Sequence, residues 1–402
     1  MKSGWEIKTL GDVCQTGAGG TPLKSKKEYY EGGTIPWLLS GEVSQGEICS
    51  TTNFISQKGL DNSSAKIFPV NTVLVAMYGA TAGQVGILRF EAATNQAVCG
   101  ILPNKRFLPK FIFYYFLSKK DELVSQAAGN AQPNISQLKI KNTAVPIPLI
   151  SEQQRIVTIL DEAFEGIATA KANAEKNLKN AHQLFESHLN SVFSQRGEGW
   201  VEDKLVSLTT KIGSGATPRG GGESYKTEGT ALIRSLNIYD FGFKYSKLAF
   251  LDDTQADGLS NVILQSGDVL LNITGASVAR CCTVPGDVLP ARVNQHVSII
   301  RPIANRLDSE FLHYLLISKY YKDQLLQTGA EGGATRQAIT KAQIQDFTVR
   351  YPADIREQKF IVDSLDFILQ QTQRLESIYQ KKIEALDALK KSILHQAFSG
   401  KL

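Results

Sequence analysis

Hydrophobic and polar residues follow two different patterns along the chain, and each pattern occurs twice. In the first pattern, short β-branched and aromatic runs alternate with turns rich in Gly, Pro and Asn, which predicts strands. The predicted strands are Val70–Tyr78, Val98–Leu102, Ala231–Ser235, Asp268–Thr274 and Val297–Ile300. One apolar amphipathic segment in each copy, Pro109–Ser118 and Ser309–Ser318, predicts a helix. We therefore expect two mixed α/β domains, at residues 1–150 and 197–352.

The second pattern is helical and begins with a capping signal in each copy. Ser151-Glu152-Gln153-Gln154 has the form of a capping box after Pro148, and Asp354-Ile355-Arg356-Glu357 follows Pro352 in the same way. Heptad columns run through both segments. In the later segment the columns are Ile361, Ile368, Leu375, Lys382, Leu389, Gln396 and Leu365, Thr372, Tyr379, Leu386, Ile393; in the earlier one they are Ile156, Ala163, Ala170, Asn177, Leu184, Ser191 and Leu160, Ile167, Ala174, Ala181, His188.

These two segments, 151–196 and 353–402, are predicted to be long helices that pair with each other. A helix over residues 152–195 would be about 66 Å long, at 1.5 Å per residue. Such a helix is too long to bury its apolar stripe against a domain of this size. Two separate surface helices are the alternative, and the heptad seam favours pairing.

Matching residues show that the chain is an internal repeat. Trp5 and Trp200 open similar segments, and both copies then have a Gly-rich turn that ends in Thr-Pro, at Thr21-Pro22 and Thr217-Pro218. Further matches are Gly79-Ala80-Thr81 with Gly275-Ala276-Ser277, Asn95-Gln96 with Asn294-Gln295, Glu152-Gln153 with Glu357-Gln358, and Phe193-Ser194 with Phe398-Ser399. The spacing between matches grows slowly from 195 to 205 residues, which indicates duplication followed by small loop insertions.

Composition excludes several classes of protein. The 402 residues are 42% hydrophobic, with no apolar run approaching the roughly 20 residues needed to cross a bilayer and no signal-peptide pattern at the start. The five cysteines are odd in number and form no CxxC pair, which argues against a disulfide framework and favours a reducing cytoplasm. The net charge of +5 permits a nucleic-acid partner without requiring one.

Catalytic signatures are missing from the sequence. It has no Walker A loop, no GxGxxG, no HExxH, no GxSxG at Ser214, and no Asn-Pro-Pro-aromatic or Asp-Pro-Pro-aromatic run of the kind an adenine methyltransferase uses. The five histidines are scattered, and three of them lie in the predicted long helices. These absences, in a duplicated chain, favour a binding or scaffolding role.

The order of these features resembles the specificity subunits of type I restriction–modification enzymes. The matching residues are Gly19-Gly20-Thr21-Pro22, Ile35-Pro36-Trp37-x-x-Ser40-Gly41, the Gly79 and Asn95 segments, the Glu-Gln helix starts and the tail Ser392 to Gly400. No single motif is decisive, but the likeness covers essentially the whole chain.

The resemblance implies a prokaryotic, cytoplasmic and non-catalytic subunit. It implies an α+β fold with a pseudo-twofold repeat, in which residues 1–150 and 197–352 are target recognition domains. Each domain would read one half of an asymmetric bipartite DNA target. The two helices would form an antiparallel coiled coil that sets the gap and docks two methyltransferase subunits, with two nuclease/translocase subunits as further possible partners. S-adenosylmethionine, ATP and Mg would be bound by the partners, and no metal or cofactor by this chain.

Candidate DNA-contacting residues are donors and acceptors on the predicted loops, because Arg suits guanine, Asn and Gln suit adenine, and Lys suits phosphate. In the first domain they are Lys24, Lys26, Lys27, Tyr29, Ser40, Tyr78, Thr81, Asn95 and Gln96. In the second they are Arg219, Arg234, Asn237, Thr274, Ser277, Arg280, Asn294, Gln295 and Arg336. For Asn95 and Asn294, capping of a turn is an equal alternative to DNA contact.

Two other functions compete with DNA specificity. A tandem coiled-coil scaffold that recruits proteins predicts no salt-sensitive DNA binding, whereas phosphate contacts weaken steeply with salt. A divergent nuclease or methyltransferase predicts activity from the purified chain alone, and the missing motifs argue against it.

Overall fold

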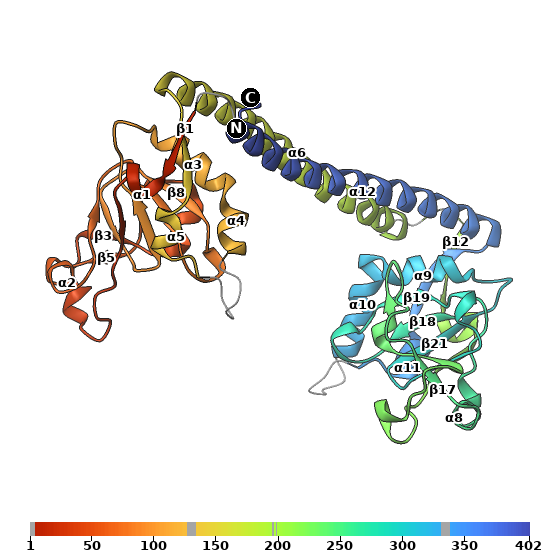
Figure 1. Ribbon diagram of the computed structural model, residues 1–402. Coiled ribbons are helices and arrows are strands. Elements are labelled where there is room, and N and C mark those ends of the chain that lie inside the picture. Colours follow the sequence, from red (N-terminus) through yellow and green to blue (C-terminus); the bar gives the residue numbers. More distant parts are fainter. Residues whose placement is uncertain (1–4, 127–133, 195–196, 198, 331–337) are drawn as a thin grey trace. The chain divides into compact units, whose positions relative to one another are not determined.

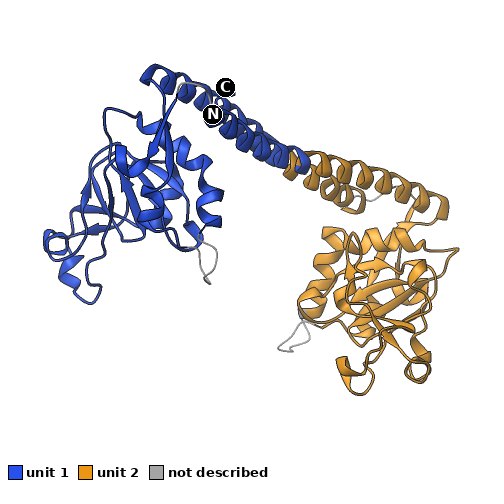
Figure 2. Ribbon diagram, viewed as in Figure 1, with its two compact units in different colours: residues 1–175, 380–402 blue, residues 176–379 orange. Residues whose placement is uncertain are grey.

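The computed structural model describes residues 5–126, 134–194, 197, 199–330 and 338–402. The chain divides into two compact units, Met1–Glu175 with Gln380–Leu402 and Lys176–Tyr379 (Figure 2). Each unit holds one globular domain and one half of each long helix, α6 (Ile150–Ser194) and α12 (Ile355–Ser399) (Figure 1). Domain 1 is the part of the first unit that precedes α6, and domain 2 lies between α6 and α12.

Domain 1 contains three sheets with the strand orders β1-β11, β2-β10-β7-β8-β4 and β5-β3-β9-β6. Its strands are β1 (Glu6–Thr9), β2 (Thr16–Ala18), β3 (Ile35–Leu38), β4 (Glu47–Ile48), β5 (Phe54–Ile55), β6 (Ile67–Phe68), β7 (Val73–Ala76), β8 (Val85–Leu88), β9 (Ala92–Thr94), β10 (Val98–Ile101) and β11 (Ala144–Ile147). Its helices are α1 (Leu10–Val13), α2 (Gln57–Asp61), α3 (Pro109–Ser118), α4 (Lys120–Ser125) and α5 (Gln137–Lys141), with 3-10 turns η1 (Lys27–Tyr29), η2 (Ser40–Gln45) and η3 (Gly79–Thr81).

Domain 2 has the sheets β12-β22, β13-β21-β18-β19 and β17-β14-β20, and the hairpin β15-β16. Its strands are β12 (Trp200–Lys204), β13 (Thr209–Ser214), β14 (Thr230–Ile233), β15 (Ile238–Tyr239), β16 (Gly242–Phe243), β17 (Ala249–Leu251), β18 (Val269–Asn272), β19 (Cys281–Thr283), β20 (Ala291–Val293), β21 (Val297–Pro302) and β22 (Thr348–Pro352). Its helices are α7 (Leu205–Leu208), α8 (Asp253–Asp257), α9 (Ser309–Ile317), α10 (Lys319–Ala330) and α11 (Lys341–Asp346), with 3-10 turns η4 (Gly221–Ser224), η5 (Ser235–Asn237), η6 (Ser260–Val262), η7 (Gly275–Ser277) and η8 (Gly286–Val288).

The two domains share one topology, as the internal repeat predicts. The strand order β2-β10-β7-β8 of domain 1 corresponds to β13-β21-β18-β19 of domain 2. Both domains also contain a parallel pair between strands distant in sequence, β3 with β9 and β14 with β20. The five predicted strands and the two predicted domain helices are all present in the structure. Duplication has therefore preserved the frame, and domain 1 adds β4 and β6.

Halves of the two long helices lie antiparallel within each unit. In the first unit, Lys171 Nζ lies 2.7 Å from Asp387 Oδ1, and Arg155 Nη2 donates to the carbonyl oxygen of Leu402 over 3.0 Å. In the second unit, His182 Nδ1 lies 2.7 Å from Glu376 Oε1. The same unit buries Phe185, Leu189 and Phe193 of α6 in one core with residues of α12. The predicted antiparallel pairing is thus present in both units.

One of the two predicted heptad columns leaves the helix seam partway along each helix. The column through Leu160, Ile167, Ala174 and Ala181 is buried. In contrast Leu184, Leu375 and Leu389, predicted to be in the seam, are 54%, 37% and 47% exposed, and Phe185 takes the buried place beside Leu184. An α-helix has 3.6 residues per turn, so a strict seven-residue column drifts away from a partner unless the helices supercoil. The prediction was wrong for these three leucines.

A buried glutamine attaches each domain to the start of its following helix. Gln153 Oε1 accepts from Leu108 N over 2.9 Å, while its Nε2 donates to Arg106 O over 2.9 Å and to Pro148 O over 3.0 Å. Gln358 makes the same three hydrogen bonds, with Asp308 N at 2.8 Å, Arg306 O at 2.9 Å and Pro352 O at 2.8 Å. Both glutamines are 0% exposed, so the matching Glu-Gln helix starts supply a buried polar clamp.

Aromatic residues complete each domain–helix junction. Phe111 of α3 packs edge-on against Phe398 at 5.4 Å between ring centroids, and Phe311 of α9 packs against Phe193 at 5.3 Å. Tyr114 OH donates to Asp161 over 2.5 Å, and Tyr314 OH donates to Asp366 in the same way. Burial, together with these carboxylates, raises the pKa of both tyrosines. Each domain is therefore held by one helix start and by the end of the other helix.

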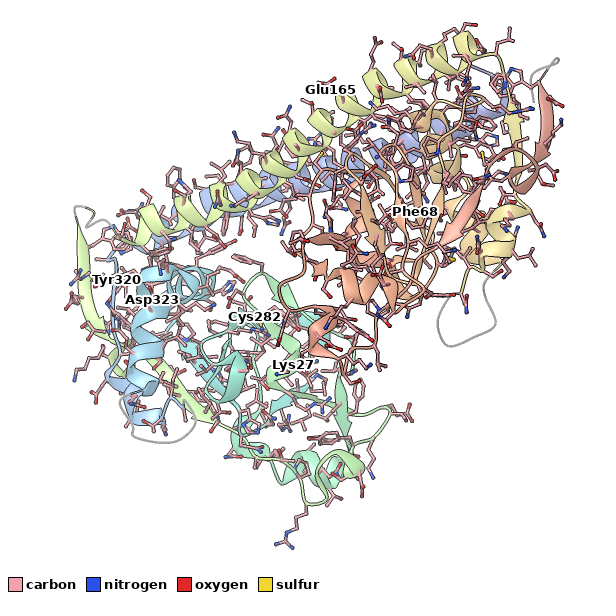
Figure 3. The ribbon with its side chains drawn as sticks, turned by 90° about the vertical axis from the view of Figure 1, so that its left-hand side faces the viewer. Lys27, Phe68, Glu165, Cys282, Tyr320 and Asp323 are labelled. Carbon is pink, nitrogen blue, oxygen red and sulfur yellow. The ribbon has the colours of Figure 1, made fainter. Side chains whose placement is uncertain are left out.

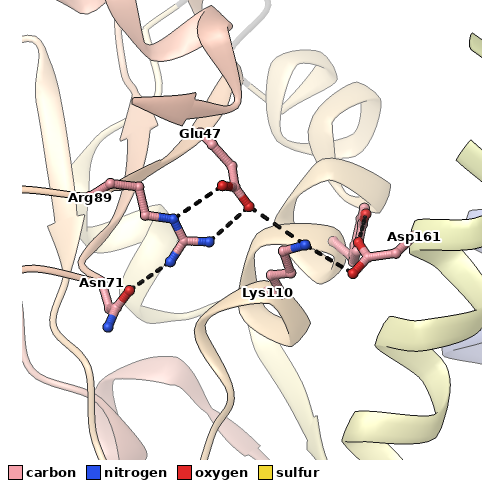
Figure 4. Close-up of polar contacts among 6 residues, drawn as sticks. Glu47, Asn71, Arg89, Lys110 and Asp161 are labelled. Atoms are coloured by element: carbon pink, nitrogen blue, oxygen red, sulfur yellow. Dashed lines mark hydrogen bonds and ion pairs between the residues drawn. The ribbon is translucent and has the colours of Figure 1, made fainter. Parts of the chain in front are cut away.

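Domain 1 has a network of charged side chains at its junction with α6 (Figure 4). Arg89 Nη2 lies 2.8 Å from Glu47 Oε1, and its Nη1 donates to Asn71 over 2.6 Å. Lys110 Nζ lies 3.5 Å from Glu47 and 2.9 Å from Asp161 of α6. The hydrogen bond from Arg89 is the main cause that lowers the pKa of Glu47. At the position equivalent to Lys110, domain 2 has Glu310, which lies 3.5 Å from His313 Nδ1.

No helix within the described residues is both long enough and apolar enough to cross a membrane.

Candidate nucleic-acid interface

Four loops of domain 1 meet at one end of the domain, because the strands that precede them end there. We define this loop end as residues 19–30, 39–41, 77–84 and 95–97, which follow β2, β3, β7 and β9. Backbone hydrogen bonds join the loops: Gly20 N donates to Thr94 O over 2.8 Å, Asn95 N to Leu38 O over 2.9 Å, and Met77 N to Ala97 O over 2.7 Å. Motif residues far apart in sequence are therefore neighbours.

Domain 2 has an equivalent loop end, at residues 215–219, 234–247, 273–280 and 294–296. Gly215 N donates to Asn294 O over 3.2 Å, Asn294 N to Ile233 O over 3.1 Å, and Ile273 N to His296 O over 3.0 Å. Asn272 bridges two of these loops, since its Nδ2 donates to Ser235 O over 3.0 Å and to Ser277 Oγ over 3.1 Å. The same scaffold thus holds the loops in both domains.

The Thr-Pro and Asn-Gln motifs form one polar unit in each domain. The Thr21 hydroxyl donates to Gln96 Oε1, and the Thr217 hydroxyl donates to Gln295 Oε1. The preceding asparagines hold the turn, because Asn95 Oδ1 accepts from Ala97 N over 3.2 Å and Asn294 Oδ1 accepts from His296 N over 3.1 Å. The turn-capping alternative therefore describes both asparagine side chains, while the glutamines are exposed.

Close approach of two backbone segments explains the glycine in each Thr-Pro turn. A Cβ on Gly19 would lie 2.4 Å from Asn95 O, and one on Gly215 would lie 1.7 Å from Val293 O. Neither distance is possible for a real side chain, so the loop must move aside for any other residue. Gly79 and Gly275 are required for a different reason, since their φ angles of 71° and 79° are left-handed.

The candidate residues of domain 1 divide into exposed and internally bonded groups. Lys24, Lys27 and Gln96 are exposed, and Figure 3 places Lys27 at the end of the domain away from the helix that carries Glu165. Ser40 begins η2 and is half-buried. Tyr29 is only 6% exposed, and its hydroxyl accepts from Lys26 Nζ over 3.3 Å. Tyr78 is 38% exposed, and its carbonyl oxygen accepts from Thr81 Oγ1 over 3.3 Å.

In domain 2, the candidate arginines differ from the other candidates in their surroundings. Arg219 is exposed. The Arg234 guanidinium lies 5.0 Å from the Tyr225 ring centroid, and its Nη2 donates to Lys247 O over 2.5 Å. The Arg280 guanidinium lies 4.8 Å from the Tyr239 ring centroid. Arg336 lies outside the described residues.

The remaining candidates of domain 2 take part in the loop scaffold. Asn237 is 0% exposed, with Oδ1 accepting from Arg234 N over 3.1 Å and Nδ2 donating to Lys244 O over 2.8 Å. Thr274 Oγ1 lies 2.6 Å from His296 Nδ1, and Ser277 Oγ accepts from Asn272. These side chains hold the loops in position. The exposed side chains beside them are the ones that a ligand can reach.

Several residues at the loop ends were missed by the sequence reasoning. Tyr239 and Tyr225 support arginines, Lys244 Nζ lies 5.7 Å from the Tyr239 ring centroid, and Lys247 has a positive φ of 61°. Gln84 occupies in domain 1 the place that Arg280 has in domain 2. Alignment of the two repeats could have found Gln84. The Tyr239 contacts arise only from folding of the β15-β16 hairpin, and the Tyr225 contact comes from the segment directly after η4.

The loop ends present exposed polar and charged side chains that can contact a ligand. Exposed amide, ammonium and guanidinium groups supply hydrogen-bond donors that match phosphate oxygens and the acceptor atoms of base edges. Among the described residues, no group of three or more His, Cys, Asp or Glu side chains is arranged to hold a metal ion. Burial raises the pKa of Cys282 to about 12 and that of Cys99 likewise to about 12, which disfavours their reactive thiolates.

Comparison with known families gives one match to a family model. Residues 2–180 and 226–385 match the type I restriction modification DNA specificity domain. The two matched regions together cover most of the chain. The first contains the loop-end motifs of domain 1, and the second begins after Thr217-Pro218 and contains the other loop-end motifs of domain 2.

Relatives of this chain include specificity subunits from a bacterium and an archaeon. The chain is 30% identical to the type I restriction enzyme EcoR124I/EcoR124II specificity subunit of Escherichia coli over 194 residues, which are 47% of this chain and 48% of that protein. It is 24% identical to the type I restriction enzyme MjaVIII specificity subunit of Methanocaldococcus jannaschii, across 99% of this chain and 93% of that protein. The first alignment thus spans about half the relative's length.

A solved structure shares the fold across the full chain. Its title is "Structural basis underlying complex assembly and conformational transition of the type I R-M system", and it matches with a TM-score of 0.79 and 22% identity over 100% of this chain and 99% of that one. The predicted fold class, two similar mixed α/β domains with two long helices, is confirmed.

Proposed function

Because the chain belongs to the type I restriction modification DNA specificity domain family, we propose that domains 1 and 2 each read one half of an asymmetric bipartite DNA target. We assign the recognition domains to residues 1–150 and 197–352, and the helical spacers to 151–196 and 353–402. The paired helices set the gap between the half-sites and provide the surface on which methyltransferase subunits dock. As a specificity subunit the chain itself is non-catalytic.

The observation that carries this proposal is that both domains have an equivalent loop end and an equivalent junction with a long helix. Each domain holds its Thr-Pro, Asn-Gln and 3-10 turn segments together with backbone hydrogen bonds, and those of Asn95 and Met77 in domain 1 are repeated by Asn294 and Ile273 in domain 2. Each domain is also seated on its helix by the same buried glutamine clamp. Side chains on the loops differ between the domains, so a shared frame carries two different recognition surfaces. That is the arrangement an asymmetric target with two unlike halves requires.

Partners supply the chemistry that this chain lacks. Adenine methylation with S-adenosylmethionine belongs to two methyltransferase subunits, and ATP- and Mg-dependent cleavage belongs to two nuclease/translocase subunits where these are present. The DNA-contacting residues are those of the loop ends, and they include the exposed Lys24, Lys27, Gln96, Arg219 and Gln295. The compartment is the prokaryotic cytoplasm, where the DNA is.

Modification-sensitive sequencing of host DNA tests the proposal. Cells with this chain and its methyltransferase partner should carry adenine methylation at an asymmetric bipartite sequence, and deletion of the chain alone should remove it. Replacing both Thr21 and Gln96 by alanine should reduce methylation, because it alters the loop end of domain 1. Replacing both Thr217 and Gln295 by alanine should do the same through the loop end of domain 2. An unchanged methylome after deletion, together with DNA binding that does not depend on salt, would instead support the coiled-coil scaffold.

A further inference from the structure

One position in the repeat carries different base-reading chemistry in the two domains. Gln84 and Arg280 follow η3 and η7 and directly precede β8 and β19. Gln84 N donates to Thr81 O over 3.0 Å, and Gln84 O accepts from Ala76 N over 2.9 Å. Arg280 N donates to Ser277 O over 3.1 Å, and Arg280 O accepts from Asn272 N over 2.8 Å. The two backbones are therefore held in the same way at the two loop ends.

Both side chains lie on the sheet face opposite the domain helix. Successive residues of a strand point to opposite faces. Cys281 belongs to the core that contains Phe311 of α9, and Cys282 belongs to the separate core of domain 2. In domain 1, Val85 likewise faces the core with Phe111. Residues 84 and 280 therefore point away from α3 and α9, on the side of the 3-10 turns and hairpin that follow β3 and β14.

The Arg280 guanidinium packs on an aromatic ring and keeps its charge and its hydrogen-bond donors available. Its guanidinium stacks 4.8 Å from the centroid of the Tyr239 ring, which is itself 38% exposed. Among the described residues, no hydrogen bond or ion pair to that guanidinium is present. Other arginines of domain 2 do have carboxylate partners, such as Arg301 with Asp268 at 2.6 Å. Stacking on an aromatic ring fixes the plane of the guanidinium fork while its donors stay available.

The contrast with domain 1 begins in the sequence. Residues 1–150 contain two arginines, Arg89 and Arg106, and neither lies in the loop-end segments. Arg89 is held by Glu47 and Asn71. At the position equivalent to Arg280, domain 1 has the half-buried Gln84, whose side-chain amide has no hydrogen-bond partner within the described part of the chain. A guanidinium fork matches O6 and N7 of guanine, whereas an amide matches N6 and N7 of adenine.

We infer that residues 84 and 280 are equivalent specificity-determining positions, with Arg280 reading a guanine in the half-site of domain 2 and Gln84 an adenine in the half-site of domain 1. The inference rests on the proposed function. Tyr239 is a positioning residue, because it orients the guanidinium of Arg280. The wild-type target should therefore require a G·C pair in one half and an A·T pair in the other, each at the base pair that faces this position.

Exchange of the two side chains tests the inference in the full chain with its methyltransferase partner. Methylated sites are mapped by sequencing for Arg280→Gln, Gln84→Arg and the wild type. Arg280→Gln should relax or invert one G·C requirement by roughly 5- to 150-fold, the range typical of a bidentate base contact, and should leave the other half unchanged. Gln84→Arg should do the reverse at one A·T pair. Arg350→Gln, which removes an arginine already bonded to Glu202, should change neither half.

Two further variants separate base reading from phosphate binding and from misfolding. Arg280→Lys keeps the charge, so under the inference it relaxes the same base pair while total methylation changes little. Tyr239→Ala should weaken discrimination at that base pair alone. Uniform loss of methylation at every site with Arg280→Gln, restored by Arg280→Lys, would show a phosphate contact and overturn the inference. So would an unchanged target in both exchange variants. Absence of any bipartite target in the wild type would instead overturn the proposed function.

Discussion

The two ends of each domain have diverged to different degrees. At the helix end, Gln153 and Gln358 make the same three hydrogen bonds, and Tyr114 and Tyr314 both bond to an aspartate of the following helix. At the loop end, the backbone scaffold is shared, but domain 2 presents arginines on tyrosines where domain 1 presents lysines and an amide. The helix end can stay fixed and preserve the assembly, while the loop end varies and changes the target.

The strongest test of the shared scaffold is a substitution at the close approach in the Thr-Pro turn. Gly215→Ala places a Cβ 1.7 Å from a backbone oxygen, and we expect it to destabilise domain 2 by about 3 kcal/mol or more. Gly213→Ala is the matched control, because a Cβ there has nothing within 4 Å, and its effect should stay within about 0.5 kcal/mol. Urea denaturation measures both. Equal effects at the two glycines would contradict the scaffold described for the turn.

The helix-end comparison predicts that two distant substitutions have the same cost. Gln153→Met and Gln358→Met each leave a buried backbone N–H and two carbonyls without their partner, so each should destabilise its own unit by about 2 kcal/mol. Gln154→Ala and Lys359→Ala, the exposed next residues, serve as matched controls with little effect. Hydrogen exchange in β11 and β22 would report each junction separately. A large effect at one glutamine only would mean that the two junctions are not equivalent.

The charge network of domain 1 predicts a small difference between the helix ends of the two domains. Arg89 holds the pKa of Glu47 below its usual value, so the ionised form of Glu47 stabilises the folded state. That contribution is present above the pKa of an unfolded glutamate, near 4.3, and is lost as the pH falls through the lowered native value. Because Glu47 is about half exposed, the effect should be roughly 0.5 kcal/mol.

Glu47→Gln measures this contribution. The difference in urea midpoint between wild type and variant should shrink as the pH is lowered from 6 to 3. A difference that stays constant across this range would show that the ionisation of Glu47 does not stabilise the junction.

Much of this architecture could be predicted from the sequence because it depends on local patterns. Apolar runs predicted β7, β10, β18 and β21, and the Asp354 signal predicted the start of α12, where Asp354 Oδ1 accepts from Arg356 N over 2.9 Å. The Ser151 signal was one residue late, because α6 already begins at Ile150. The seam was predicted only in part: a strict seven-residue column placed Leu184 inside, whereas the buried residue is Phe185, which packs against Phe241 and Tyr314 of domain 2.

The candidate site was harder to predict because its residues depend on folding. The repeat located the Thr-Pro and Asn-Gln motifs, and the structure bonds them to each other. The repeat could not show that Asn237 and Tyr29 are buried. The sequence of a Gly-rich loop does not indicate whether its polar and aromatic side chains face water or the scaffold. The support of Arg280 by Tyr239 depends on a hairpin whose register is set by long-range contacts.

The most direct test of the central claim uses a chain with two copies of one recognition domain. If the frame is shared and the loops alone choose the target, replacing residues 197–352 by 1–150 at matched junctions should redirect methylation to a target whose halves are identical and inverted. Sequencing of methylated DNA, with the methyltransferase partner present, gives the result. A symmetric target built from the half-site of domain 1 is the predicted outcome. A folded, assembled chain that still methylates the original asymmetric target would contradict the account.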